Sequence, residues 1–363
     1  MIMKLKKSTK AILTVILISV VAVVLFLLDN GTIGNNHTKQ IVMLSAIYAV
    51  IGVSMNLVNG FTGIFSLGQA GFMAIGAYVV GVFTIDPAVR SSLYYVTPIS
   101  DSIVNVYIPF WAALLIGGVI AVIFAALIGA PVLKLKSDYL AIATLGFSEI
   151  IRVFFSGKHM EPFTNGSMGL KAIPKFSTIF TPILISAVCI GIMVLLINST
   201  YGRAFKAIRE DEVAAEAMGI NLFKHKQLSF VTSAFFAAVG GGLLAACLGT
   251  VDPNQFKITI TYELLLIVVL GGMGSVTGTI IASFLITAGK EWLRFFDNPM
   301  TIGGVSIPIF RPGLRMVIFS ILLMVIVLFY RRGIMGMNEF SWDGIANFLR
   351  FNKKAKTGGG ADE

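Results

Sequence analysis

The feature that most constrains this chain is a series of apolar stretches, each long enough to cross a lipid bilayer as a helix. An α-helix rises about 1.5 Å per residue, so about 20 apolar residues cross the ~30 Å hydrocarbon core. A helix also satisfies its own backbone hydrogen bonds, which lipid cannot do. The sequence therefore predicts an all-α, polytopic integral membrane protein.

Ten stretches are candidates for such spans, which gives about ten transmembrane helices. The eighth and ninth are individually short, so they could instead form one long, glycine-broken helix or a re-entrant pair. The ten candidates are residues 11–28, 39–58, 69–85, 109–133, 139–155, 178–198, 227–248, 260–271, 276–289 and 313–330.

The composition excludes several other classes of protein. Of the 363 residues, 56% are hydrophobic and 13% are charged, whereas soluble domains carry about 25% charged residues. The net charge of +10 could suggest a nucleic-acid partner, but the basic residues lie between or beside apolar runs, as membrane topology requires. Cys189 and Cys247 lie inside apolar runs and fit neither a disulfide framework nor a zinc site, and no metal or cofactor is predicted.

The distribution of basic residues predicts the topology. With the N-terminus in the cytoplasm and ten alternating spans, most Lys and Arg residues fall on the cytoplasmic side. We therefore expect a multi-pass protein of the inner (plasma) membrane with both termini cytoplasmic and a retained first helix. The cytoplasmic basic residues are Lys4, Lys6, Lys7, Lys10, Lys134, Lys136, Arg203, Lys206, Arg209, Lys224, Lys226, Arg331, Arg332, Arg350, Lys353, Lys354 and Lys356.

The same topology divides the chain into a transmembrane domain, residues 1–332, and a cytoplasmic C-terminal tail, residues 333–363. The tail is basic, ends in a run of glycines, and is expected to be partly disordered. The polar connections 86–108 and 156–177 are external, and the charged connection 199–226 is cytoplasmic.

Glycine interrupts two of the hydrophobic regions, at residues 59–71 and 271–278. Irregular backbone at membrane depth is tolerated only beside protein or water, so such breaks indicate a substrate pathway. They could equally be tight turns between helices. Four polar side chains near the first break are candidates for lining the path, or for satisfying backbone groups that the break leaves free: Asn56, Asn59, Ser66 and Gln69.

Two spans carry small residues at every fourth position, which lets helix backbones approach closely in lipid. These stripes predict tight packing, either within the chain or between two chains. They consist of Gly117, Ala121, Ala125 and Gly129, and of Ala234, Ala238, Gly242 and Ala246.

The charged connection contains a segment, residues 201–220, that is rich in helix-forming residues. Ala204, Ile208, Ala215 and Met218 fall close to one face of the expected helix. Gly219 suits the C-terminal cap, where the backbone is left-handed. The segment therefore predicts a short charged helix that projects from the membrane into the cytoplasm.

Four segments carry a resemblance to a known family: residues 59–78, 135–152, 201–219 and 262–278. Together they resemble the branched-chain amino-acid permeases of ATP-binding-cassette importers, on the M-type side of their paired H and M subunits. The resemblance implies the importer permease fold, with the charged segment docking on an ATPase subunit. By this resemblance the residues that couple to the ATPase are Arg203, Arg209, Glu212, Ala215, Glu216 and Gly219.

The resemblance also implies partners: two ATPase subunits, a second permease subunit, and an extracytoplasmic binding protein that delivers an amino acid. The sequence has no Gly-x-x-x-x-Gly-Lys-Ser/Thr phosphate loop. We therefore expect a transport subunit rather than an enzyme, with ATP hydrolysed by separate chains.

Few charged residues lie inside the spans, where each costs at least about 2.5–3.5 kcal/mol. Glu149 and Arg152 can pair on one helix face, and Glu263 opens the eighth span near the external surface. A chain of acidic residues across the midplane is missing, which disfavours an ion-coupled carrier. A permease for urea, amides or other amino acids stays open as an alternative, since the binding protein largely sets substrate choice.

Overall fold

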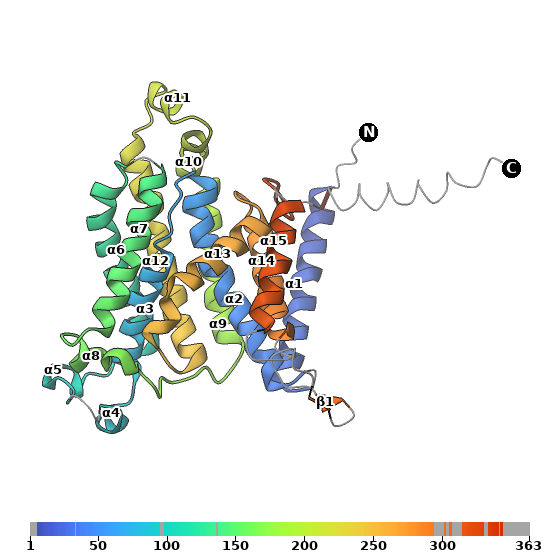
Figure 1. The fold of residues 1–363 in the computed structure, drawn as a ribbon. Helices are drawn as coiled ribbons and strands as arrows, with labels where there is room; N and C mark the ends of the chain where they lie inside the picture. The colour runs from blue at the N-terminus through green and yellow to red at the C-terminus, as the bar shows by residue number, and fades with distance from the viewer. Residues whose placement is uncertain are drawn as a thin grey trace.

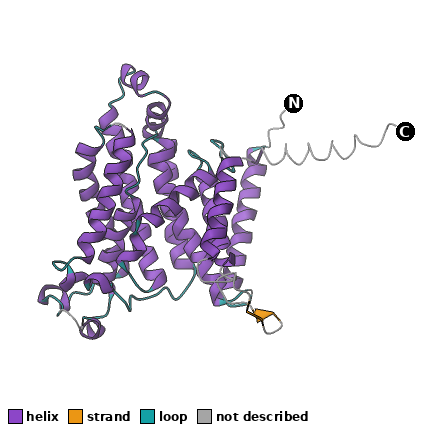
Figure 2. Cartoon of the chain, viewed as in Figure 1, coloured by secondary structure: helices purple, strands orange, loops and turns teal. Residues whose placement is uncertain are grey.

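Helices lie at all ten predicted positions in a computed structural model of the chain (Figures 1 and 2). The structure describes residues 6–32, 34–94, 98–135, 137–293, 301–302, 305–306, 314–329, 333–340 and 342–343. Within these residues, regular β-structure is limited to the two-residue strands β1 (Thr301–Ile302) and β2 (Val305–Ser306). The prediction of an all-α fold is confirmed.

The ten helices differ in length. Six are long and apolar enough to cross a membrane: α1 (Lys7–Asp29), α2 (Asn36–Asn56) with its π-helical extension η1 (Leu57–Phe61), α6 (Phe110–Val132), α7 (Ser137–Ser156), α9 (Phe180–Asn198) and α12 (Leu222–Leu248). The other four have 14 to 17 residues: α3 (Gln69–Thr84), α13 (Ile258–Gly271), α14 (Val276–Trp292) and α15 (Leu314–Phe329). The number of crossings therefore stays a prediction.

The centre of the bundle is α12, which packs against α2, α3 and α6. Small residues make this packing possible. A Cβ atom added at Gly76 of α3 would lie 1.9 Å from the carbonyl oxygen of Ala238, and one at Gly241 would lie 2.0 Å from the carbonyl oxygen of Met73. On α6, a Cβ at Gly117 would lie 3.2 Å from the Cα of Gly76. Both small-residue stripes thus pack helices of the same chain together, and neither is left for a dimer contact.

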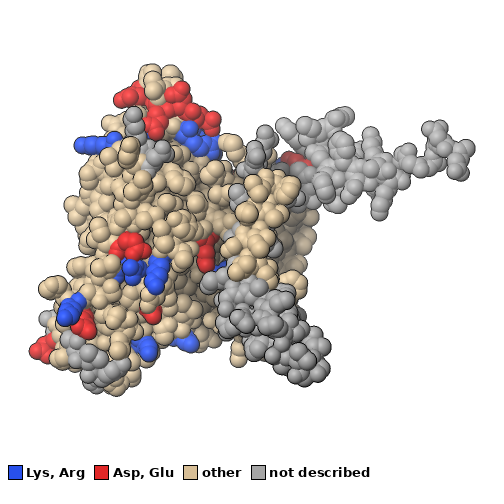
Figure 3. All heavy atoms as spheres, viewed as in Figure 1, with Lys and Arg blue, Asp and Glu red and all other residues tan. Residues whose placement is uncertain are grey.

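The two ends of the bundle carry different structures (Figure 1). The helices α10 (Thr200–Glu210) and α11 (Glu212–Ala217) project at one end, and Figure 3 shows charged side chains gathered over them. The short helices α4 (Pro87–Leu93), α5 (Asp101–Val104) and α8 (Glu161–Thr164) lie at the opposite end, with the 3₁₀ turns η2 (Gly166–Met168) and η3 (Pro253–Phe256) on the connections nearby. The connections predicted to be cytoplasmic and external therefore lie on opposite sides.

A buried arginine holds the loop helices of the second end together. The Arg90 side chain is 2% exposed and donates hydrogen bonds from Nε to the Ile85 carbonyl, at 3.0 Å, and from Nη1 to the Ile103 carbonyl. Burial lowers the pKa of this guanidinium from its ordinary value. The bonds join α4 to α5 outside the spans.

The second glycine-broken region is a turn between two separate helices, α13 and α14. Gly272 and Gly274 have φ angles of +113° and +92°, which favour glycine. A Cβ at Gly278 would lie 2.1 Å from the carbonyl oxygen of Gly271, so the helix ends touch backbone to backbone. The alternative of one long glycine-broken helix is therefore wrong.

Candidate coupling junction

The projecting segment consists of two helices where the sequence predicted one. Asp211 separates α10 from α11: its backbone is extended, with φ −159°, and its Oδ1 accepts hydrogen bonds from the backbone amides of Val213 and Ala214, at 2.9 and 3.1 Å. An aspartate that caps a new helix in this way competes with continuation of the old one. The break turns α11 away from α10, so Met218 does not share a buried face with Ile208.

The end of α11 agrees with the prediction made for Gly219. Gly219 has φ +85°, its amide donates to the Glu216 carbonyl at 2.9 Å, and the Ile220 amide donates to the Ala215 carbonyl at 3.1 Å. This pair of bonds is a Schellman motif, which requires a left-handed residue. A Cβ at Gly219 would meet nothing within 4 Å, so backbone conformation alone favours glycine there.

The projecting segment presents apolar side chains to its surroundings. Val213 and Met218 are 78% and 84% exposed, and Arg203 and Glu216 are also exposed. Ala215 is buried. The predicted coupling residue Glu212 forms an ion pair with Lys226 of α12, with Oε2 2.6 Å from Nζ. The tip of α11 thus combines exposed apolar side chains with charges, a composition typical of a docking surface.

Arg209, at the end of α10, lies where the two glycine-broken regions meet. Its Nη1 donates to the carbonyl oxygen of Gly60 at 2.9 Å, and its Nη2 lies 2.6 Å from Oε1 of Glu210. A Cβ at Gly63 would lie 2.8 Å from Cγ of Arg209, and a Cβ at Gly274 would lie 2.7 Å from its Nη1. Both breaks therefore leave room for this one side chain, and we call the contact of Arg209 with them the coupling junction.

Asn56, beside the first glycine-broken region, forms hydrogen bonds with the second one. Its Nδ2 donates to the Ser275 carbonyl at 2.9 Å and to Oγ1 of Thr279 at 2.8 Å, while its Oδ1 accepts from the Gly274 amide at 2.9 Å. The side chain is fully buried. Each amide atom of Asn56 thus has a partner in the turn between α13 and α14, as a buried polar group requires.

The other predicted path residues are also buried and hydrogen-bonded. Asn59 and Ser66 bond to each other across the extended stretch: the Ser66 amide donates to Oδ1 of Asn59 at 3.1 Å, and Nδ2 of Asn59 donates to the Ser66 carbonyl at 3.2 Å. Nε2 of Gln69 donates to Oγ of Ser54 at 2.6 Å and of Ser233 at 3.2 Å. These side chains satisfy polar groups near the break, and their role in a path stays a prediction.

Two cavities open beside the coupling junction, and Arg209 lines both. One has a volume of about 710 Å³ and is also lined by Asn59, Gly60 and Met273. The other has a volume of about 600 Å³, and its wall includes Phe61 and Lys206. Movement of α10 would therefore change the walls of both cavities together.

The C-terminal segment 333–340 closes the other side of these cavities, which the sequence did not reveal. The Ile334 amide donates to the Leu270 carbonyl at 2.7 Å. Glu339 accepts hydrogen bonds from the amides of Val276 and Thr277, at 2.7 and 3.1 Å, and from Oγ1 of Thr277 at 2.7 Å. A carboxylate at this place complements the partial positive charge at the start of α14. Segment 333–340 of the tail is therefore ordered, which agrees with an expectation of only partial disorder, and residues 341 and 344–363 lie outside the described part of the chain.

Replacing Glu339 with alanine is expected to release the segment 333–340 from α14. Charge-assisted hydrogen bonds contribute about 1.5–3 kcal/mol, so local opening should become about 10- to 100-fold more frequent. Amide hydrogen exchange of this segment measures the change. Glu161→Gln, at the opposite end of the molecule, is the control, and unchanged protection in Glu339→Ala would refute the capping role.

The geometry of the junction can be compared with known proteins. The family described as "Branched-chain amino acid transport system / permease component" matches residues 37–328. The chain belongs to this permease family. Among its relatives, the LivM high-affinity branched-chain amino acid permease protein of Escherichia coli K12 is 32% identical over 325 residues, which cover 79% of this chain and 70% of the relative.

Other members of the permease family are also similar along most of the chain. A probable LivM permease protein of Methanocaldococcus jannaschii is 24% identical over 81% of this chain and 91% of the relative. The LivH permease protein of Salmonella typhimurium is 26% identical over 68% of this chain and 81% of the relative. The predicted family is confirmed, and the chain is a multi-pass membrane permease component.

Proposed function

We propose that this chain is the membrane-spanning permease subunit of an ATP-driven importer of branched-chain amino acids. It pairs with a second, homologous permease subunit. Two ATPase subunits dock on the projecting helices, and an extracytoplasmic binding protein delivers the amino acid. The chain itself is not an enzyme: it converts movement of the ATPases into opening and closing of a path.

The observation that carries this proposal is the contact of Arg209 with Gly60. It joins α10 of the projecting segment to the broken backbone inside the bundle, and the next helix, α11, carries the exposed side chains of Val213 and Met218. An ATPase that seats α11 and moves it would pull on α10, and Arg209 would transmit the pull to both breaks. Arg203, Glu212 and Glu216 would form the charged rim of the docking surface, with Ala215 packed beneath it.

The difference between the two ends of the bundle supports the proposed arrangement. Segment 199–226 is the cytoplasmic coupling loop, residues 1–332 form the permease domain, and residues 333–363 form a cytoplasmic tail. Both termini are then cytoplasmic, and α4, α5 and α8 face the binding protein. The substrate class rests on the relatives, several of which are named as branched-chain amino-acid permeases.

Replacing Gly219 with valine tests the coupling. A β-branched residue at φ +85° costs on the order of 1–3 kcal/mol, enough to disturb the cap of the six-residue helix α11. In proteoliposomes that contain the assembled transporter, uptake of leucine should fall about tenfold while ATP hydrolysis continues. Asparagine tolerates the left-handed conformation, so Gly219→Asn is the matched control and should retain more uptake.

Two outcomes would count against the proposal. Normal uptake in Gly219→Val would show that α11 does not transmit the movement. Uptake by this chain without any ATPase, following an ion gradient, would favour an ion-coupled carrier instead.

A further inference from the structure

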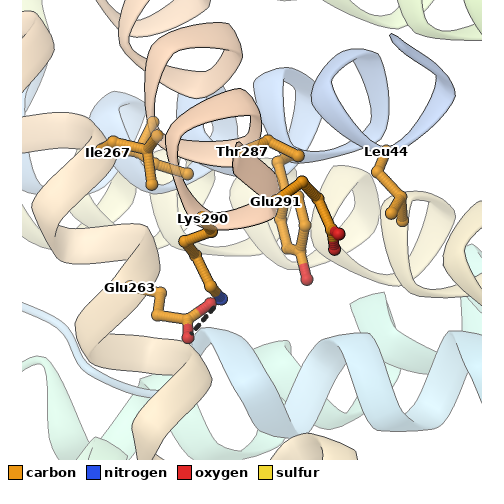
Figure 4. A pocket seen from close by; sticks show the side chains of 8 residues that line it. Leu44, Glu263, Ile267, Thr287, Lys290 and Glu291 are labelled. Carbon is orange, nitrogen blue, oxygen red and sulfur yellow. Dashed lines mark hydrogen bonds and ion pairs between the residues drawn. The ribbon is translucent and has the colours of Figure 1, made fainter. Parts of the chain in front are cut away.

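A third cavity lies away from the coupling junction, where α2, α13 and α14 meet (Figure 4). It is small, about 80 Å³. Leu44, Ile267 and Ile286 supply apolar walls, and Glu263, Lys290 and Glu291 supply charges. An apolar surface with a few converging charged groups is the usual composition of a small-molecule site.

The charges come from different helices and point into the same space. Nζ of Lys290 on α14 lies 2.7 Å from Oε1 of Glu263 on α13, and Figure 4 shows the two side chains pointing toward each other. Glu291 follows on α14, and its Oε2 lies 3.4 Å from Nε2 of His37 on α2. Within the described residues, this is where ionisable side chains of α2, α13 and α14 converge.

Partial burial makes these charges costly. The side chains of Glu263 and Lys290 are 32% and 30% exposed, and that of Glu291 is 22% exposed. Glu263 is on α13, and Lys290 and Glu291 are in the last turn of α14. Charged side chains on membrane helices are rare and mark the paths of ions or charged substrates.

We infer that this cavity binds the charged head group of an α-amino acid during transport. The inference rests on the proposed function and names a substrate contact for it. An amino-acid zwitterion carries the same two charges as the Glu263–Lys290 pair. Its ammonium can bind Glu263 and Glu291, and its carboxylate can bind Lys290, so that each charge exchanges one partner for another.

The apolar wall of the cavity suits the carbon atoms next to the head group. A branched apolar side chain would contact Leu44, Ile267 and Ile286, which need no hydrogen bond. The small volume suits a head group that passes through. Binding should also be weak, because a transport path must release the substrate again. Urea and neutral amides lack both charges and would leave the ion pair intact, so the site selects α-amino acids against them.

The test compares ion-pair variants in the assembled transporter with its ATPases, second permease and binding protein. Glu263→Gln is expected to reduce ATP-dependent leucine uptake about tenfold or more, while ATP hydrolysis continues. The charge swap Glu263→Lys with Lys290→Glu keeps an ion pair but reverses its direction relative to the apolar wall. It should therefore fail to restore uptake. The control Glu149→Gln with Arg152→Gln removes the pair on α7 and should leave uptake unchanged.

A second measurement follows occupancy directly. With Cys189 and Cys247 replaced by alanine, Thr287→Cys places a thiol in the cavity wall. Leucine should slow its modification by a small thiol reagent severalfold, urea should not, and Glu263→Gln should abolish the protection.

The outcomes separate the two proposals. If the unaltered transporter shows no ATP-dependent leucine uptake, the proposed function fails. If that uptake is normal, full rescue by the charge swap, or no protection of the thiol by leucine, would overturn the head-group site and leave a structural ion pair.

Discussion

Adding one methyl group at Gly76 is expected to remove most of the folded protein from the membrane. In Gly76→Ala the new Cβ would lie 1.9 Å from the Ala238 carbonyl oxygen and 2.7 Å from the Ala238 Cα. The neighbouring atoms belong to backbone, so no side chain can rotate away, and α3 must separate from α12. Overpacking of a core typically costs about 1–3 kcal/mol, and a backbone clash should reach the upper end or exceed it.

Gly191→Ala is the matched control for this prediction. Gly191 lies in the middle of α9, and a Cβ added there meets nothing within 4 Å. Because alanine favours helix over glycine by about 1 kcal/mol, this variant should be as stable as the natural protein or more so. Yield and thermal unfolding of both variants in mild detergent measure the effect. Equal stability of Gly76→Ala and Gly191→Ala would refute the close approach of α3 and α12.

Replacing Arg209 with alanine is expected to separate ATP hydrolysis from transport. The variant loses the bond to the Gly60 carbonyl, and with it the contact between α10 and the first break. A hydrogen bond to a charged group contributes about 1.5–3 kcal/mol, which corresponds to a change of about 10- to 100-fold in coupled uptake. ATP hydrolysis by the assembled transporter should continue, because Arg209 lies at the membrane end of the projecting segment.

The size and shape of the guanidinium matter to this prediction. Arg209→Lys keeps the charge but not the fork of donors that reaches Gly60 and Glu210 together, so intermediate uptake is expected. Lys224→Ala removes an exposed basic residue at the start of α12 and should leave uptake unchanged. Full uptake in Arg209→Ala would show that the junction transmits no movement.

Local features of the chain were predictable because their causes lie within a few residues. The apolar runs predicted where helices lie, since each run is long and its backbone must be satisfied internally. Gly219 predicted the end of α11, since the cap depends only on local hydrogen bonds, from the Gly219 amide to Glu216 and from the Ile220 amide to Ala215. Glu149 and Arg152 predicted their own ion pair, at 2.7 Å. The single helix predicted over 201–220 is wrong, because Asp211 caps a second helix there.

Only the tertiary structure decided which polar groups meet. The Arg209–Gly60 bond joins residues 149 positions apart, and the bond of Asn56 to Ser275 joins residues 219 apart. Glu339 reaches Val276 from 63 positions away. Such pairs depend on how whole helices pack, and no local periodicity encodes that packing. The sequence by itself determined where the helices lie, that they are apolar enough for a membrane, and to which family the protein belongs. The packing of α2, α12, α13 and α14 decided where its coupling junction and its charged cavity lie.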